Sequence, residues 1–234
     1  MTSLSFRKFI IFVTFLSFTP LFAQNKYVKW IDKKHFKRVV RNLDEDSKKS
    51  SNDYIDLLDI YFAYSYLYNN RNYKGYDTKL SYDNILRAER YYSNAFIDNP
   101  SKLKRKKITK VIIDAKLNEI CQNAFDDYSL IDSVKNYNYF INNFTRMSGD
   151  LKSKTLALRN LKAFSNAKLV DSEDAYVNYI ISYPNSEFYY QAIELRNERA
   201  FEIAENLNTV DSYENFLEKY PKSSQKKKCN RENS

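Results

Sequence analysis

The sequence predicts an all-α fold, an α-solenoid array of helical hairpins with about nine helices. Three observations lead to this prediction: glycine is scarce, a segment of about 37 residues repeats, and apolar residues within each copy follow helical spacing. Only two glycines occur in 234 residues, Gly75 and Gly149. Because glycine supplies tight turns and close backbone approach to phosphates, this composition disfavours hairpin-rich sheets, P-loops and dinucleotide loops.

Residues 1–23 are predicted to be a secretory signal peptide. Arg7 and Lys8 precede the apolar run Phe9 to Phe22, and Leu21-Phe22-Ala23 is a suitable cleavage site. The run is shorter than the roughly 20 residues of a spanning helix, and no later segment is long and apolar enough to span. We therefore expect an exported chain with no transmembrane segment after the signal, with an uncleaved anchor as the alternative.

Residues 24–116 are predicted to form irregular helical hairpins. Apolar residues at helical spacing mark Val28 to Leu43, Tyr54 to Tyr68, Asp77 to Phe96 and Ile108 to Tyr128, the last of which runs into the repeats. Asn69 to Tyr76 is the expected connection, and Asn99-Pro100 is expected to end the third helix because proline disfavours helix at the residue before it.

Residues 117–221 are predicted to form helical repeats. Leu156–Ser186 aligns with Ile193–Ser223 at an offset of 37, without a gap and with twelve identities in 31 positions. A third copy lies 39 residues upstream, where Ala124-Phe125 matches Ala163-Phe164. A period of about 34 to 47 residues with two helices per unit is typical of α-solenoids.

Each unit is expected to consist of a short helix, a turn and a longer helix. In the last copy the short helix places Tyr213, Phe216, Leu217 and Tyr220 on one stripe. Thr209 or Asp211 suits its N-cap, as Asp171 or Ser172 suits that of the copy before. Pro184 and Pro221 stop the short helices, Ser186 can cap the longer helix, and Ala200 and Ala204 allow close packing.

The last unit is expected to lack its second helix. Residues 222–234 are predicted to be a disordered basic tail, because Lys226, Lys227 and Lys228 occupy the span of that helix. The stripe from Tyr213 to Tyr220 would then keep one bare side, open to self-association or to a partner. The alternative is that the chain is a shortened version of a longer protein.

The unit Tyr176–Phe201, with Tyr-Pro-x-Ser between its helices, resembles the tetratricopeptide-like (BamD-like) repeats of exported bacterial envelope proteins. The likeness is good over Asn118–Ser223 and holds in outline over residues 26–117. It implies an α-superhelix, location in the periplasm or at the outer membrane, and protein–protein binding. It implies no catalytic residues.

Positive charge is clustered in this chain of net charge +9. Lys26 to Arg41 holds seven bases against Asp32, and Lys102 to Lys110 holds six bases and no acid. These clusters are interpreted as solvated helix ends or as contacts to an anionic lipid, polysaccharide or acidic protein. Nucleic acid is not an expected partner, because an exported chain rarely meets it.

No catalytic, metal or cofactor site is predicted. His35 is the one histidine and is expected at the surface; Cys121 is expected in the core, and Cys229 lies in the polar tail. The carboxylates of Asp126-Asp127 and Asp44-Glu45-Asp46 are adjacent in sequence, so they point about 100° apart on a helix and make poor acid–base pairs. A glycosidase with a tyrosine-rich groove is the weaker, enzymatic alternative.

These observations predict a non-catalytic protein–protein interaction scaffold of the bacterial cell envelope, with a protein or peptide partner and no cofactor. Two alternatives remain: a truncated N-terminal repeat module of a larger envelope protein, and a binder of anionic polysaccharide or lipid.

Overall fold

The computed structural model describes residues 25–49 and 53–228, all in helices, turns and connections with no strand among them. The predicted signal peptide and Cys229 lie outside the described residues. The helices are α1 (Lys26–Asp32), α2 (Phe36–Lys49), α3 (Tyr54–Tyr68), α4 (Thr78–Asp98), α5 (Pro100–Lys106), α6 (Lys110–Ile131), α7 (Val134–Asn143), α8 (Gly149–Val170), α9 (Glu173–Ser182), α10 (Tyr189–Leu207) and α11 (Val210–Lys219), followed by a helical turn at 226–228. Counting that turn, the described residues hold twelve helices, so the prediction of about nine was too low.

The first additional helix arises at a corner between α1 and α2, where one helix was predicted. Lys34 adopts a left-handed φ of 59°, and the amide of His35 donates to the carbonyl of Trp30 at 2.8 Å. The corner brings both helices onto one short stretch of α3. Their buried side chains form the N-terminal core with α3: Tyr27, Ile31, Val39, Leu43, Ile60, Ala63 and Leu67. A straight helix, rising about 1.5 Å per residue, would spread Val28 and Leu43 about 22 Å apart.

The second additional helix is α5, which follows α4 without a loop. Asn99 ends α4 and also caps α5, because its side chain accepts from the amide of Lys102 at 3.1 Å. Pro100 occupies the first turn of α5, where its missing N–H costs nothing. Asn-Pro was interpreted only as a helix end, although the same pair is a helix start.

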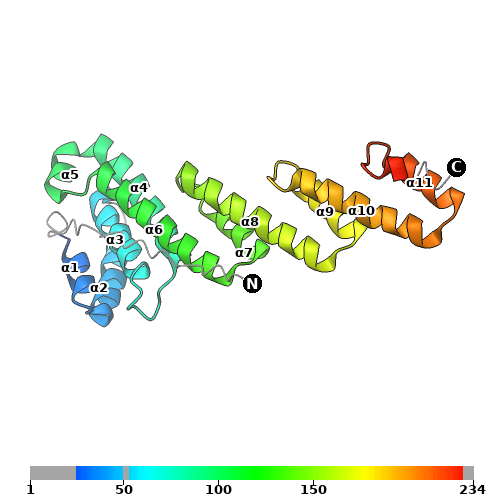
Figure 1. Cartoon of the computed structure of the whole chain (residues 1–234). Helices are drawn as coiled ribbons and strands as arrows, with labels where there is room; N and C mark the ends of the chain where they lie inside the picture. The colour runs from blue at the N-terminus through cyan, green and yellow to red at the C-terminus, as the bar shows by residue number, and fades with distance from the viewer. Residues whose placement is uncertain (1–24, 50–52, 229–234) are drawn as a thin grey trace, which may run out of the picture.

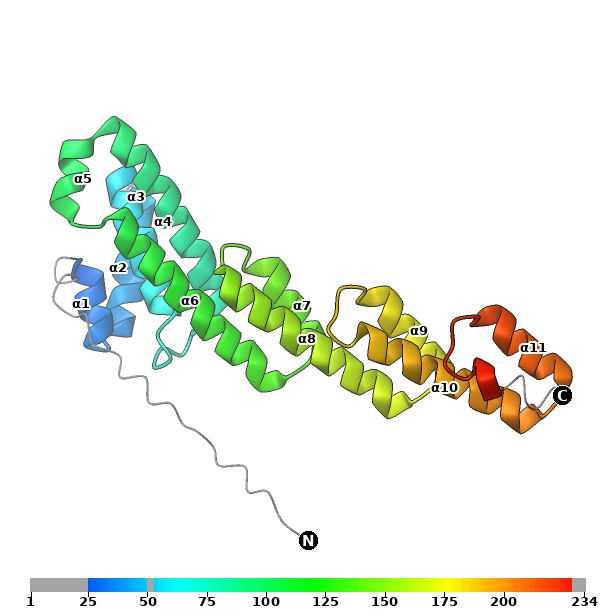
Figure 2. The same cartoon turned by 45° about the horizontal axis from the view of Figure 1, so that its top comes forward.

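The helices are arranged as a broad N-terminal bundle and a narrow extension (Figures 1 and 2). Helices α1 to α6 lie side by side, and α7 to α11 extend from them as successive helical pairs. The largest buried apolar cluster spans α3 to α8 and includes Val28 of α1. The narrow part holds two smaller clusters, one over α8 to α10 and one between α10 and α11. Each pair in the narrow part therefore buries its apolar side chains mainly against the helices next to it in sequence.

The same left-handed backbone conformation recurs in the turns between these pairs. Asp132, Asp171 and Asn208 end α6, α8 and α10 in the left-handed conformation, with φ between 43° and 48°. The next residue in each case, Ser133, Ser172 or Thr209, caps the short helix that follows. Of the two predicted choices for each cap, the structure thus selects Ser172 and Thr209. The α10 cap differs from the prediction: Phe188 is the N-cap residue, and Ser186 Oγ accepts from its amide at 3.1 Å.

The C-terminal unit is better covered than the sequence suggested. Tyr213, Phe216 and Tyr220 are buried, because they pack on Ala200, Phe201 and Ala204 of α10. The amide of Ser223 donates to the carbonyl of Tyr220 at 3.0 Å, as that of Ser186 does to Tyr183, and a helical turn follows at 226–228. The expectation that no helix can begin here was wrong, and of the predicted stripe only Leu217 stays half-buried.

Candidate functional site: two equivalent grooves

A shallow groove runs between α8 and α9, with one wall residue from α7. Its volume is about 550 Å³, and we call it the first groove. It is lined by Val134, Ala163, Asn166, Ala167, Val170, Ser172, Asp174, Ala175, Asn178, Tyr179, Ser182 and Tyr183. The floor consists mainly of alanine and tyrosine, and Asn178 on the rim is exposed.

A second groove of about 180 Å³ lies one unit further along, between α10 and α11. It is lined by Glu173, Ala200, Ile203, Ala204, Leu207, Ser212, Asn215, Phe216, Lys219 and Tyr220. Every one of these ten residues has its counterpart in the first groove, nine at an offset of 37 and Glu173 at 39 from Val134. The two grooves are therefore the same feature of two successive units.

Both grooves are closed at one end by the tyrosine that ends the short helix. The Arg159 guanidinium lies 5.0 Å from the ring centroid of Tyr183, and that of Arg196 lies 4.3 Å from the ring of Tyr220. Each arginine also donates two hydrogen bonds, of 3.2 and 2.8 Å, to the side-chain oxygen of the asparagine that follows it. This arrangement holds the tyrosine ring in the same place in both units.

The second groove contains an ion pair that the first groove lacks. Lys219 Nζ lies 2.6 Å from Glu173 Oε1, and the Tyr220 hydroxyl donates to the same carboxylate. In the first groove the corresponding residues are Ser182 and Val134, which cannot form such a pair. Burial raises the pKa of Glu173, but the hydrogen bonds from Lys219 and Tyr220 outweigh burial and hold this pKa below its ordinary value. The carboxylate is thus charged at neutral pH, and Glu173 forms part of the lining of the second groove.

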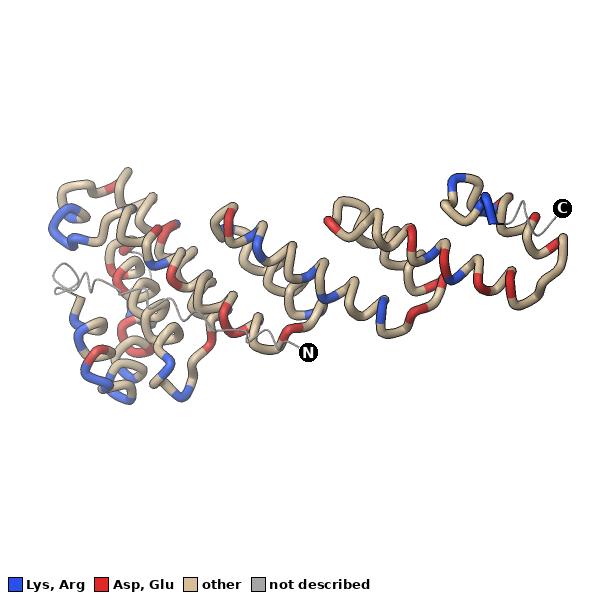
Figure 3. Tube along the Cα trace, in the orientation of Figure 1, with Lys and Arg blue, Asp and Glu red and all other residues tan. Residues whose placement is uncertain are grey.

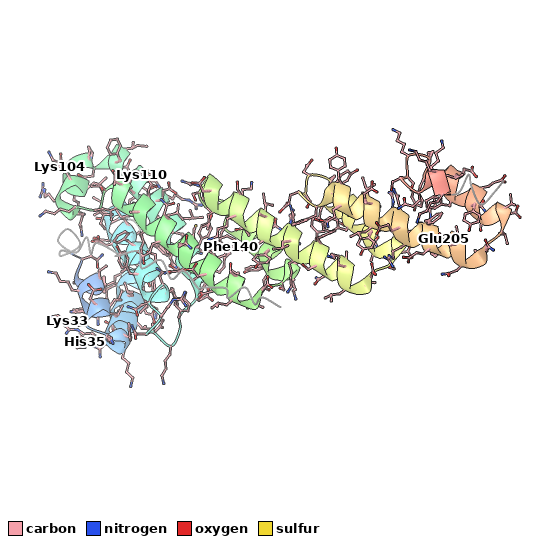
Figure 4. The ribbon with its side chains drawn as sticks, viewed as in Figure 1. Lys33, His35, Lys104, Lys110, Phe140 and Glu205 are labelled. Atoms are coloured by element: carbon pink, nitrogen blue, oxygen red, sulfur yellow. The ribbon has the colours of Figure 1, made fainter. Side chains whose placement is uncertain are left out.

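Cys121 and His35 lie where the sequence predicted. Cys121 is buried in α6, and burial raises the pKa of its thiol to about 12, so it is protonated at neutral pH. His35 is exposed at the corner between α1 and α2 (Figure 4). Among residues 25–49 and 53–228, no three His, Cys, Asp or Glu side chains gather as a metal site would require.

The acidic clusters hold neighbouring helices together. Asp127 accepts from the Tyr76 hydroxyl at 2.6 Å and pairs with Arg71 at 2.7 Å. Asp44 accepts from the Tyr64 hydroxyl at 2.7 Å, and Asp46 pairs with Lys26 at 3.0 Å. These carboxylates thus have partners on other elements, and the grooves contain no closely spaced carboxylate pair.

Sequence reasoning did not identify the groove residues. The alignment did pair Asn178 with Asn215, and neither lies on the apolar stripe of its helix. The signal that could have identified the grooves was this identity at an exposed position of both repeats, because packing does not require the same residue at an exposed position.

No protein-family model matches the chain, and neither a curated protein nor a solved structure matches it. Nor is any helix among the described residues long and apolar enough to cross a membrane.

Proposed function

We propose that this protein is a non-catalytic interaction scaffold whose tetratricopeptide-like helical hairpins hold a segment of a partner protein in the first groove. The observation that carries the proposal is the recurrence of one groove at equivalent positions of two units. A recess required only by packing would not need the same exposed asparagine, small floor residues and terminal tyrosine twice.

The chemistry of the first groove suits a peptide segment. Ala163, Ala167 and Ala175 leave room for an apolar side chain above Tyr179. The exposed amide of Asn178 carries both donors and an acceptor, which match the N–H and C=O groups of an extended backbone. A concave apolar floor with a few polar groups on its rim is the usual form of a binding site.

The repeat architecture is part of the same proposal. It is supported by the equivalent left-handed turns, by the equivalent caps and by the small separate cores of the narrow part. Successive hairpins that contact mainly their neighbours are the physical basis of a solenoid, and such arrays present extended binding surfaces.

The proposal can be tested by moving the ion pair of the second groove between the two grooves. Val134→Glu with Ser182→Lys should copy it into the first groove, and Glu173→Val with Lys219→Ser should remove it from the second. Peptides selected from a displayed library on residues 24–234 would be titrated against both variants and the parent chain by fluorescence anisotropy.

We expect the groove-closing variant to bind the selected peptides at least about tenfold more weakly, since the ion pair occupies the recess. The groove-opening variant should gain a second equivalent site. Because each variant borrows residues that the chain already holds at the counterpart position, both should keep the parent circular dichroism spectrum. Unchanged binding to a folded groove-closing variant would contradict the proposal.

The compartment is a further part of the proposal. We propose export to the bacterial periplasm or the outer-membrane surface, on the strength of the basic, apolar and small-residue segments within residues 1–23. Residues 1–30 fused to a reporter that is active only after export should give activity, with cleavage after Ala23. A reporter retained in the cytosol would exclude this compartment.

A further inference from the structure

A third groove, the largest of the three, lies at the corner between α1 and α2. Its volume is about 870 Å³, within the roughly 300–1,000 Å³ of ligand sites, and we call it the basic groove. It is lined by Lys34, His35, Phe36, Lys37, Arg38, Val40, Arg41, Asn72, Tyr73 and Lys74. The first seven belong to the corner and α2, and the last three to the loop after α3.

The floor of the basic groove is apolar and aromatic. Phe36 and Tyr73 lie with ring centroids 5.4 Å apart, and both are half-buried, as is Val40. At the rim, the guanidinium of Arg38 lies 3.9 Å from the ring of Trp30, which limits its conformational freedom. The groove thus offers an apolar recess with cationic groups at its rim.

The cations of the rim have no neutralising partner within the described residues. Lys34, Lys37, Arg38, Arg41 and Lys74 are all exposed, and no carboxylate there forms an ion pair with them. Figure 3 shows this concentration of Lys and Arg around the corner and the adjacent loop. Mutual repulsion of such charges opposes folding unless something compensates it.

The position of two of these cations on α2 makes their charges still less favourable for folding. The first turn of α2 contains no acidic residue, and Lys37 and Arg38 lie in it. The N-terminus of a helix is its positive end, so a cation there is unfavourable where an acid would be favourable. Charges that are unfavourable for local helix stability are expected at functional sites, such as a site where a ligand is bound.

The other large basic cluster does not share this property. On α5 and at the start of α6, Lys102 pairs with Asp53 at 2.5 Å, Lys106 with Asp59 at 2.5 Å, and Lys110 with Glu89 at 3.0 Å. Half of the six bases between Lys102 and Lys110 therefore join α5 to the N-terminal half of α3 and its cap, or α6 to α4. The two clusters are alike in sequence, but only the basic groove combines unpaired cations with an apolar recess.

We propose that the basic groove binds an acidic segment of a partner protein that inserts an apolar or aromatic side chain between Phe36, Val40 and Tyr73. Charge complementarity selects the carboxylates of the segment, and the recess selects its apolar anchor. A membrane surface is the less suitable ligand, because a flat bilayer cannot fill a concavity whose apolar side chains lie below its cations. This site is separate from the first groove and does not depend on it.

The test uses three probes with the chain from residue 24 to 234. The first is a labelled peptide that alternates Asp and Glu with Leu and Phe. The second replaces each acid by Lys, and the third keeps the acids but replaces Leu and Phe by Ser. Vesicles of phosphatidylcholine with phosphatidylglycerol test the membrane alternative by sedimentation.

Only the first peptide should bind well, and its affinity should fall by about tenfold or more between about 0.05 and 0.5 M salt. Lys37→Glu with Arg41→Glu should weaken binding by at least about tenfold. The matched control, Lys104→Glu with Arg105→Glu on exposed residues of α5, should change it by less than about twofold. Tyr73→Ala should also weaken binding, through loss of the recess.

The proposal would be overturned by equal losses in the α2 and α5 variants, by equal binding of the serine peptide, or by vesicle binding without peptide binding. The groove-closing variant of the first groove should leave binding of the acidic peptide unchanged. Failure of one site is therefore distinguishable from failure of the other.

Discussion

The hydroxyl of Tyr176 donates a hydrogen bond of 2.6 Å to the carboxylate of Asp171, five residues earlier in the left-handed turn between α8 and α9. Arg199 on α10 approaches the same carboxylate to 3.5 Å. One unit earlier, Tyr137 donates to Asp132 at 2.9 Å, and Lys162 on α8 lies 2.8 Å from it. Each of these two aspartates thus joins its own turn to the next long helix.

Tyr176→Phe should destabilise the protein by about 1 kcal/mol. A hydrogen bond to a charged group is lost, but Asp171 is exposed and water replaces part of it. Urea denaturation followed by circular dichroism measures the change in the free energy of unfolding. Tyr190→Phe, on a side chain that is 79% exposed, is the control and should be neutral. Equal effects of both substitutions would show that the bond contributes nothing.

Stability should fall at alkaline pH. Burial, with a contribution from the neighbouring aspartate, raises the pKa of Tyr137 and of Tyr176 to about 12, from an ordinary value of 10.0. The unfolded chain therefore loses these protons first, so the stabilisation is complete below about pH 10 and is lost as the pH rises towards 12. Urea midpoints at about pH 9 and pH 11 would reveal the loss. Folded-state tyrosines that all titrate near 10 by ultraviolet absorbance would contradict it.

Lys116→Met should stabilise the protein by about 1 kcal/mol. Lys116 is only 5% exposed, and burial lowers the pKa of its ammonium group despite Glu119 at 2.9 Å. Methionine removes the desolvation cost and keeps most of the volume, while the half-exposed Glu119 remains solvated. Lys152→Met, at an exposed position of α8, is the matched control for chemical denaturation. A loss of stability in the Lys116 variant alone would mean that the ion pair outweighs burial.

The two glycines should respond in opposite directions to alanine. Gly149→Ala should raise stability by about 0.5 kcal/mol, because Gly149 begins α8 and an added Cβ has no heavy atom within 4 Å. Gly75→Ala should lower stability by about 1 kcal/mol, because its Cβ would lie 2.7 Å from the ring of Tyr73 and push that ring aside. Thermal unfolding of both variants checks the signs. Stabilisation by Gly75→Ala would show that Tyr73 moves at no cost.

The candidate site illustrates what a single sequence can reveal. The alignment at an offset of 37 already contained the residue pairs that line the two grooves, such as Ala163 with Ala200 and Asn178 with Asn215. It could not reveal that an ion pair lines one groove and is absent from the other. That difference depends on Lys219 and Glu173, which lie 46 positions apart and belong to different units.

The sequence by itself determined the helical class, the internal repeat of residues in the second half and two candidates for the cap of each of the last two short helices, because helical periodicity and capping act between residues a few positions apart. Tertiary structure decided the rest. It placed the corner at Lys34, where α1 and α2 meet on α3, and it neutralised Lys102 and Lys106 with carboxylates 49 and 47 positions away. The basic clusters at the N-terminus and in the middle of the chain are alike in composition. Contacts between distant helices neutralise cations of the second cluster and leave those of the first without an ion pair. The sequence shows which side chains are charged, but the fold decides which carboxylates lie close enough to pair with them.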